Sequence, residues 1–215
     1  MSSYIILSAG IGRNMKGAGC KSLIQIGSVC LIDKQISTIL KYDKEADIII
    51  VGGFEYQKLV NYIHSKKYNV RIVLNSNFAT TSQAESLKIG INSCKKSAVY
   101  IIHGDIYFDI NSLNFPDNKK AWITISDKMG EQSVGTVIRE GLIKNMCYGL
   151  ENKWGQIAFF PEKNFDTIRD SINNIRSNRL TYEFINNLPI DIFSHCDESI
   201  EINRKYENIS NLRKK

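Results

Sequence analysis

The sequence has no apolar run long enough for a membrane-spanning helix. Such a helix needs about 18 consecutive apolar residues, and no stretch approaches that length although 43% of the 215 residues are hydrophobic. The first residues also lack the basic segment and apolar core of a secretory leader. Proline is scarce, at three residues, and no linker-like segment divides the chain. We therefore expect one globular domain over residues 1–215 with no membrane partner.

Cysteine is present but in no pattern that indicates a disulfide framework or a metal site. The five cysteines are odd in number and widely separated along the chain: Cys20, Cys30, Cys94, Cys147 and Cys196. No two of them have the C-x-x-C spacing of a zinc ligand pair. We predict reduced thiols, which are typical of proteins in the cytoplasm.

Runs of like charge are also scarce. The formal net charge is +6, but the 28 lysines and arginines are spread along the chain and only 213–215 form a run. Basic and aromatic residues do not alternate as they do in many nucleic-acid-binding modules. We expect no nucleic-acid partner, and a mild positive excess fits a small polyanionic substrate.

The first half of the chain alternates short apolar runs with segments of helical periodicity. Apolar residues recur at helical spacing across 31–43, 59–63 and 87–94. The apolar runs, which predict strands buried on both faces, cover 4–7, 47–51, 70–74 and 98–102. Such alternation predicts a parallel sheet with helices on both faces.

The second half contains further strands and two helices, with Glu140-Gly141 as a hairpin turn. The predicted helices run through 165–175 and 182–188, and a charged C-terminal helix covers about 204–215. The predicted strands are 122–126, 134–139, 142–146, 157–160 and a short one at 200–202. The complete pattern predicts a single Rossmann-like α/β domain with a mixed, mainly parallel sheet flanked by helices.

The most informative segment is 5–21, I-I-L-S-A-G-I-G-R-N-M-K-G-A-G-C-K. A predicted strand is followed by Gly10 and Gly12, then by Arg13, and a short loop later by Lys21. Glycines let main-chain amides approach phosphate oxygens, and the cations neutralise them. The segment predicts a triphosphate-binding loop, with an ordinary glycine-rich turn as the alternative.

Two other predicted strands also end in polar residues. One runs into the polar segment 75–86, and another ends in His103-Gly104-Asp105. Ligands of open α/β sheets bind beyond the carboxyl ends of the strands, so hydroxyls, a carboxylate and cations meet there. This combination suits a nucleotide and a divalent metal. Taken singly, Gly104-Asp105 could be only a turn, Lys21 a solvated side chain, and Ser86 a helix cap.

In this order the motifs resemble those of the nucleotidyltransferases with a glycosyltransferase-A-type (GT-A) fold. That superfamily opens with an apolar strand, A-G-x-G-x-R-M/L, a variable loop and P-K-x-L. The matching residues are Ala9, Gly10, Gly12, Met15, Lys21 and Leu23. Later matches are Asp47 to Gly53, Ser86-Leu87, Gly104-Asp105, Gly155 to Phe160 and Glu201 to Asn203, so the resemblance covers nearly the whole chain.

The resemblance implies a GT-A-type fold and transfer of a nucleoside monophosphate from a nucleoside triphosphate to a phosphorylated acceptor, with release of pyrophosphate. It implies that Lys21 and Arg13 are the catalytic cations. It also implies that Mg²⁺ is the cofactor, held by Asp105 and Asn203. The implied nucleotide-binding residues are Ser8, Ala9, Gly10, Gly12, Asn14, Ser82, Gln83, Ser86 and Gly104.

Two positions depart from the family pattern. Asn14 stands where the motif has arginine, while Arg13 lies one position earlier. Asn203 stands where the late E-I-D motif has aspartate, and an amide oxygen brings no negative charge to a metal. Lys21 and Asp105 favour an enzyme, whereas Asn14 and Asn203 favour the alternative, a weak or inactive relative that binds nucleotide or nucleotide-sugar as a regulatory protein.

The substrates are less sharply indicated than the reaction. The resemblance assigns the nucleotide to about 1–110 and the acceptor to about 111–203. The polar segment 75–87 is similar to that of the cytidylyltransferases, with Ser82 and Gln83 in place of two asparagines, so CTP is the favoured triphosphate. A sugar 1-phosphate and a phosphocholine-like molecule both remain open as acceptor.

Overall fold

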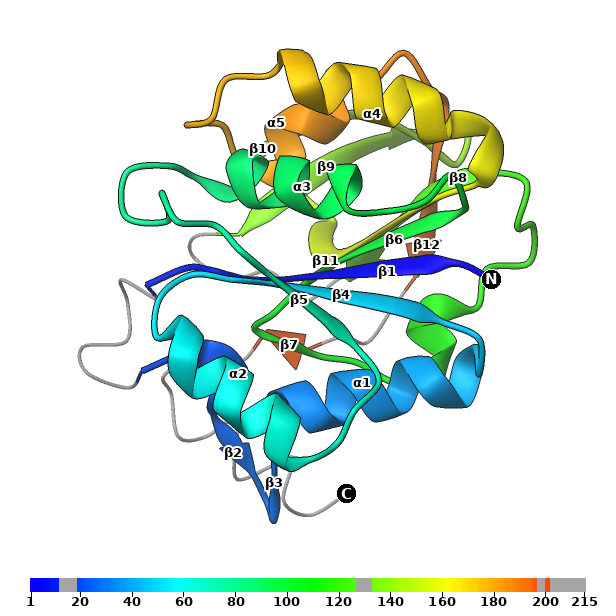
Figure 1. Ribbon diagram of the computed structural model, residues 1–215. Helices are drawn as coiled ribbons and strands as arrows, with labels where there is room; N and C mark the ends of the chain where they lie inside the picture. The colour runs from blue at the N-terminus through cyan, green and yellow to red at the C-terminus, as the bar shows by residue number, and fades with distance from the viewer. Residues whose placement is uncertain (12–18, 127–132, 197–199, 202–215) are drawn as a thin grey trace.

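The computed structural model describes residues 1–11, 19–126, 133–196 and 200–201. A nine-stranded sheet forms the centre of the molecule, in the order β5-β4-β1-β6-β11-β8-β12-β10-β9 (Figure 1). Its strands are β1 (Ser3–Ser8), β4 (Asp47–Gly52), β5 (Arg71–Leu74), β6 (Val99–His103), β8 (Ala121–Ser126), β9 (Val134–Arg139), β10 (Leu142–Tyr148), β11 (Lys153–Phe160) and β12 (Ile192–Cys196).

The four strands of the first half are parallel. β1 lies between β4 and β6, with Ile5 opposite Ile49 on one side and Ile101 on the other, and β5 adds to β4. Their carboxyl ends therefore lie at one edge of the sheet. The predicted alternation of strand and helix in this half is confirmed.

Helices cover both faces of this parallel part. Helices α1 (Leu31–Tyr42) and α2 (Tyr56–Ser65) lie on one face, and α3 (Gln83–Asn92), α4 (Phe165–Asn174) and α5 (Thr181–Asn186) lie on the other (Figure 1). Successive side chains of β1 enter different cores, because neighbouring residues of a strand point to opposite faces. Ile5 packs in the core with α3, whereas Tyr4 and Ile6 pack in the core with α1.

The second half of the sheet is mostly antiparallel. β11 pairs antiparallel with β6 and β8, and β12 pairs parallel with β8. β9 also pairs with β11, so that β11, β8, β12, β10 and β9 form a small closed sheet. The mixed sheet is thus confirmed, with its parallel pairs concentrated in the first half.

A glycine allows the closed sheet to form where β9 meets β11. Gly135 is opposite Lys153, and a β-carbon at Gly135 would lie 1.8 Å from the carbonyl oxygen of Leu150. The neighbouring Thr136 N–H donates to the Glu151 carbonyl at 2.7 Å. Only a residue without a side chain fits this approach of the two segments.

Two predictions for the second half need correction. Ile192–Cys196 is a strand that the sequence did not indicate, and the strand predicted at 157–160 begins earlier, at Lys153. The predicted final strand is found as β13 (Ile200–Glu201), which pairs with β7 (Ile106–Tyr107) directly after Asp105. The predicted C-terminal helix lies outside the described residues. The remaining elements are β2 (Gln25–Ile26), β3 (Val29–Cys30), and the 3-10 helices η1 (Lys21–Leu23), η2 (Ile110–Leu113) and η3 (Glu162–Asn164).

Among the described residues, no helix has the length and apolarity needed to cross a membrane.

Candidate functional site

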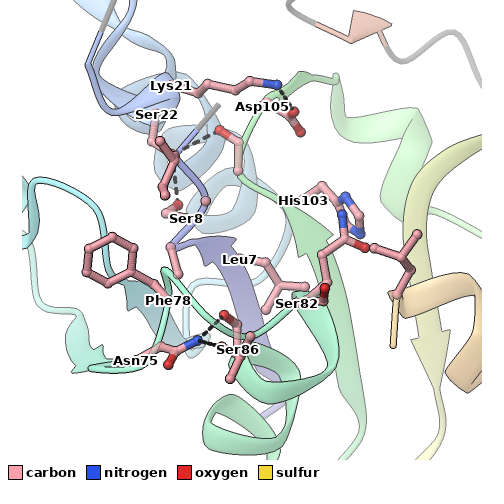
Figure 2. Close-up of a pocket in the computed structure, with 17 residues that line it drawn as sticks. Leu7, Ser8, Lys21, Ser22, Asn75, Phe78, Ser82, Ser86, His103 and Asp105 are labelled. Atoms are coloured by element: carbon pink, nitrogen blue, oxygen red, sulfur yellow. Dashed lines mark hydrogen bonds and ion pairs between the residues drawn. The ribbon is translucent and has the colours of Figure 1, made fainter. Parts of the chain in front are cut away.

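A cavity of about 360 Å³ opens at the carboxyl ends of β1, β5 and β6. Nine predicted site residues line it: Ser8, Ala9, Gly10, Lys21, Ser82, Gln83, Ser86, Gly104 and Asp105. Figure 2 shows Lys21 and Asp105 at one end and Asn75 and Ser86 at the other. The first strand, the polar segment and the Gly104-Asp105 turn thus meet at one place. Four predicted site residues, Gly12, Arg13, Asn14 and Asn203, lie outside the described residues.

Lys21 and Asp105 form an ion pair at one end of the cavity. The Lys21 Nζ lies 2.6 Å from Asp105 Oδ2, and each side chain is 20% exposed. Lys21 begins η1, and Asp105 follows β6, so two segments 84 residues apart supply the pair. The arrangement joins a positive charge to a hard anionic oxygen at the edge of the sheet.

Three hydroxyl and carbonyl groups fix Lys21 beside Asp105. The Ser22 hydroxyl donates to the Gly104 carbonyl at 2.9 Å and lies 2.8 Å from the Ser8 Oγ. Because the single Ser22 hydrogen is used by Gly104, the Ser8 hydroxyl must donate to Ser22. Both serines are buried. This network ties η1 to the ends of β1 and β6.

Gly104 is a glycine because other groups approach its α-carbon closely. A β-carbon there would lie 2.5 Å from Ser8 Oγ and 2.7 Å from the Leu7 carbonyl oxygen. Gly10 differs, since a β-carbon there would have no neighbour within 4 Å. Space therefore requires glycine at position 104 and not at position 10.

Cys20, directly before Lys21, is held by a glutamate. The Cys20 N–H donates to Glu55 Oε2 at 2.9 Å, and Glu55 also pairs with Lys58. These bonds, first that to Lys58, lower the pKa of Glu55. Cys20 has φ −62°, an angle that proline also adopts, but proline would lose the bond to Glu55. Burial raises the pKa of the Cys20 thiol, which makes it a poor nucleophile.

The opposite end of the cavity is organised by Asn75. Its side-chain nitrogen donates to Ser86 Oγ at 3.0 Å and to Thr81 Oγ1 at 3.3 Å, while its oxygen accepts from the Asn77 N–H at 3.0 Å. Ser86 lies inside α3 and is buried, so the capping alternative is wrong. The N-cap of α3 is Ser82, whose hydroxyl makes no capping bond.

Sequence reasoning missed several residues that line the cavity. Ser22, Phe78 and Leu180 were not predicted, and Leu180 comes from the second half of the chain. His103, to which no role was given, also lines the cavity and packs edge-on against Trp154, with ring centroids 5.1 Å apart. Ser22, directly before Leu23 in the K-S-L segment, gave no signal by itself, since serine is common in turns.

The donor set fits a magnesium ion that is shared with a phosphate. Mg²⁺ takes about one or two carboxylates, together with phosphate oxygens and water. Asp105 supplies one partly exposed carboxylate beside the predicted phosphate loop. Within the described ranges, no group of three His, Cys, Asp or Glu residues could hold a metal alone. Phosphate oxygens, or residues outside the described ranges, would complete the coordination.

The fold and the cavity define a mixed α/β protein whose candidate site lies at the carboxyl ends of parallel strands. The family profile of the MobA-like NTP transferase domain matches residues 4–114. This match covers more than half of the 215 residues, so the chain belongs to that family. A search of curated proteins found no match.

Several solved structures are similar to this protein over nearly the whole length of its chain. CTP:phosphocholine cytidylyltransferase from Streptococcus pneumoniae superimposes with a TM-score of 0.80 at 20% identity, covering 99% of this chain and 98% of that one. Inositol-1-phosphate CTP transferase from T. maritima gives 0.77 at 14% identity, with coverage of 99% and 95%. A nucleoside-diphosphate-sugar pyrophosphorylase from Vibrio cholerae RC9 gives 0.77 at 12% identity, with full coverage of both chains. These similarities establish the nucleotidyltransferase fold.

Proposed function

We propose that this protein transfers a nucleoside monophosphate from a nucleoside triphosphate to the phosphate of a small acceptor, with release of pyrophosphate. Membership of an NTP transferase family supports the class of reaction. The observation that carries the proposal is the pairing of Lys21 with Asp105 at the mouth of the strand-end cavity. A cation and a metal-binding carboxylate at the end of a glycine loop are what a triphosphate requires.

The proposed reaction needs alignment and charge stabilisation more than a base. An acceptor phosphate oxygen bonds to the α-phosphorus, and the bond from that phosphorus to the β-phosphate oxygen breaks. The attacking oxygen is already anionic, so no strong general base is required. Lys21 stabilises the charge on the transferred and departing phosphates, and main-chain amides near Gly10 donate to the triphosphate. Gly12, Arg13 and Asn14 are proposed to complete this loop.

Asp105 is the residue proposed to hold Mg²⁺, with Asn203 as a second ligand. When bound, the ion would neutralise phosphate charge and order the triphosphate. Lys21 forms an ion pair with the Asp105 carboxylate, so Lys21 and the metal ion would compete for that carboxylate. A bound triphosphate relieves this competition, because it offers Lys21 other anionic oxygens.

The nucleotide is assigned to about 1–110 and the acceptor to about 111–203. We favour CTP, since two of the similar structures are named for their use of CTP. The proposed acceptor is a sugar 1-phosphate or a phosphocholine-like molecule. We also propose a cytoplasmic location without nucleic-acid or membrane partners, in keeping with five free cysteines.

A second candidate is a binding protein with little or no turnover. Asn14 and Asn203 support it, because both replace charged residues of the family motifs. Such a protein would bind a nucleotide or nucleotide-sugar and act on a partner.

The test is pyrophosphate release by the full chain with Mg²⁺, each of the four ribonucleoside triphosphates, and a panel of acceptors. The panel contains sugar 1-phosphates, phosphocholine and inositol 1-phosphate. Acceptor-dependent release should fall at least a hundred-fold, an oxyanion-type loss, in Lys21→Ala and in Asp105→Ala. Lys96→Ala and Asp166→Ala are matched controls, because these residues form an exposed ion pair on the helical face. Unchanged release in Lys21→Ala would refute the mechanism. Binding of one triphosphate without release would favour the second candidate.

A further inference from the structure

The start of α3, which lines the cavity, is docked on a segment from the second half of the chain. The Ser82 N–H donates to the Ser177 carbonyl at 2.8 Å, and the Ala84 N–H donates to the Arg179 carbonyl at 3.0 Å. Leu180 of the same segment lines the cavity. These bonds satisfy amides that the first turn of a helix leaves without partners. The segment 177–181 therefore supports the start of α3 and, through Leu180, also contributes to the wall of the cavity.

Gln83, between these two anchors, has a fixed side-chain orientation. Its Oε1 accepts from both the Thr181 N–H and the Thr181 hydroxyl, each at 3.1 Å. A main-chain N–H can only donate, so the atom that faces it must be the oxygen of the amide and not the nitrogen. Thr181 is fully buried. The two bonds thus determine which end of the Gln83 amide faces Thr181.

The other end of the amide is what Gln83 presents to the cavity. Gln83 lines the cavity, and in the part of the chain that the structure describes no acceptor is paired with its NH₂ group. Both lone pairs of its oxygen are occupied by Thr181. Towards a ligand, Gln83 is therefore a hydrogen-bond donor and not an acceptor.

A fixed donor distinguishes cytosine from uracil at ring position N3, whereas both bases carry an acceptor at O2. Cytosine has acceptors at both N3 and O2, so the NH₂ group can donate to this edge. Uracil carries a hydrogen at N3. A glutamine whose amide is free to rotate would accept a hydrogen bond from this N3–H with its side-chain oxygen. With that oxygen occupied, the N3–H of uracil faces another donor, and such a mismatched polar pair weakens binding.

We propose that Thr181 is a positioning residue that fixes the Gln83 amide as a donor and thereby selects a cytosine nucleotide over a uracil nucleotide. The inference rests on the proposed function, because it assumes that the base lies at this wall of the cavity. It assigns nucleotide selection in part to α5, which lies outside the region matched by the family profile.

The test is equilibrium binding of CTP and of UTP, each with Mg²⁺, to the full chain and its variants. Gln83→Glu keeps an oxygen for Thr181 and turns an acceptor towards the base, so the ratio of CTP to UTP affinity should fall about ten-fold. Thr181→Val should lower the ratio by less, because the Thr181 N–H still donates. Thr181→Ser keeps the hydroxyl and should keep the ratio. The melting temperature of each variant shows that it is folded.

Each outcome decides a different point. A ratio that falls in Gln83→Glu and in Thr181→Val, and is retained in Thr181→Ser, supports the inference. An equal loss of CTP and UTP affinity in Gln83→Glu would overturn it, since a purely structural role weakens both. A wild-type chain that prefers a triphosphate other than CTP would overturn it and leave nucleotidyl transfer intact. Failure of the wild type to bind any triphosphate would overturn the proposed function as well.

Discussion

Replacing Lys21 by methionine should have opposite effects on the two ligands of the site. Methionine keeps most of the length of the side chain but removes its charge. Asp105 then loses the cation that lies 2.6 Å away. Its carboxylate becomes free for a divalent ion, whereas the triphosphate loses a counter-charge. We therefore expect tighter metal binding without nucleotide and weaker nucleotide binding.

The magnitude follows from the exposure of the pair. Ion pairs at the surface contribute about 0.2–1 kcal/mol. Both side chains here are only 20% exposed, so the upper end of that range, about 1 kcal/mol, is appropriate. This free energy corresponds to about a five-fold change in a dissociation constant. Without nucleotide, Lys21→Met should bind a divalent ion about five-fold more tightly than the wild type.

Mn²⁺ is a suitable probe, because electron paramagnetic resonance detects the free ion even when binding is weak. The titration compares the wild type, Lys21→Met and Lys96→Met, whose lysine pairs with Asp166 on an exposed helix. Asp105→Asn should abolish the site in both backgrounds. If Lys21→Met binds Mn²⁺ no better than the wild type, Lys21 and the metal do not compete for Asp105. The mechanism would then need another carboxylate.

Two further predictions concern stability. Gly104→Ala should lower the free energy of unfolding by about 1–3 kcal/mol, because its β-carbon would meet Ser8 and the Leu7 carbonyl. Gly10→Ala should leave the free energy of unfolding unchanged, because a β-carbon there has no close neighbour. Urea unfolding of both variants tests this, and equal stability of the two would contradict the close packing around Gly104. Burial first, and then the hydrogen bond to Asp33, raise the pKa of Tyr68 to about 12 from its ordinary value of 10.0. The folded state thus holds the Tyr68 proton more tightly, so this stability is present below about pH 10 and is lost as the pH rises through about 12. Unfolding curves at about pH 9 and about pH 11 should diverge less in Tyr68→Phe than in the wild type, and an equal divergence would show that Tyr68 does not contribute.

The first half of the fold could be predicted because its strands are continuous apolar runs. Strands β1, β4 and β6 are buried on both faces, and their ends carry the motif residues. β12 was missed because I-F-S-H-C mixes polar with apolar residues and is only partly buried. The start of β11 was missed because its register shifts between Trp154 and Ala158, with Gln156 at φ 67°. Such an irregularity breaks the alternation by which a strand is identified.

The candidate site was predictable where residues follow strands and unpredictable where distant segments dock. Ser8, Gly104 and Asp105 stand at the ends of recognisable strands. The bond of Ser22 to Gly104 spans 82 residues, and the bonds of Thr181 to Gln83 span 98. No local pattern encodes such contacts, because they depend on how the two halves of the chain pack.

The closed sheet has a consequence for the free edges of the protein. An open sheet exposes unpaired main-chain groups at its last strand, where other chains can add by strand pairing. Pairing of β9 with β11 at Gly135 covers part of that edge in the second half, and the short β5 lies at the other end of the sheet. The closure depends on Gly135, so any side chain at that position would separate β9 from β11 and expose more of this edge to strand addition.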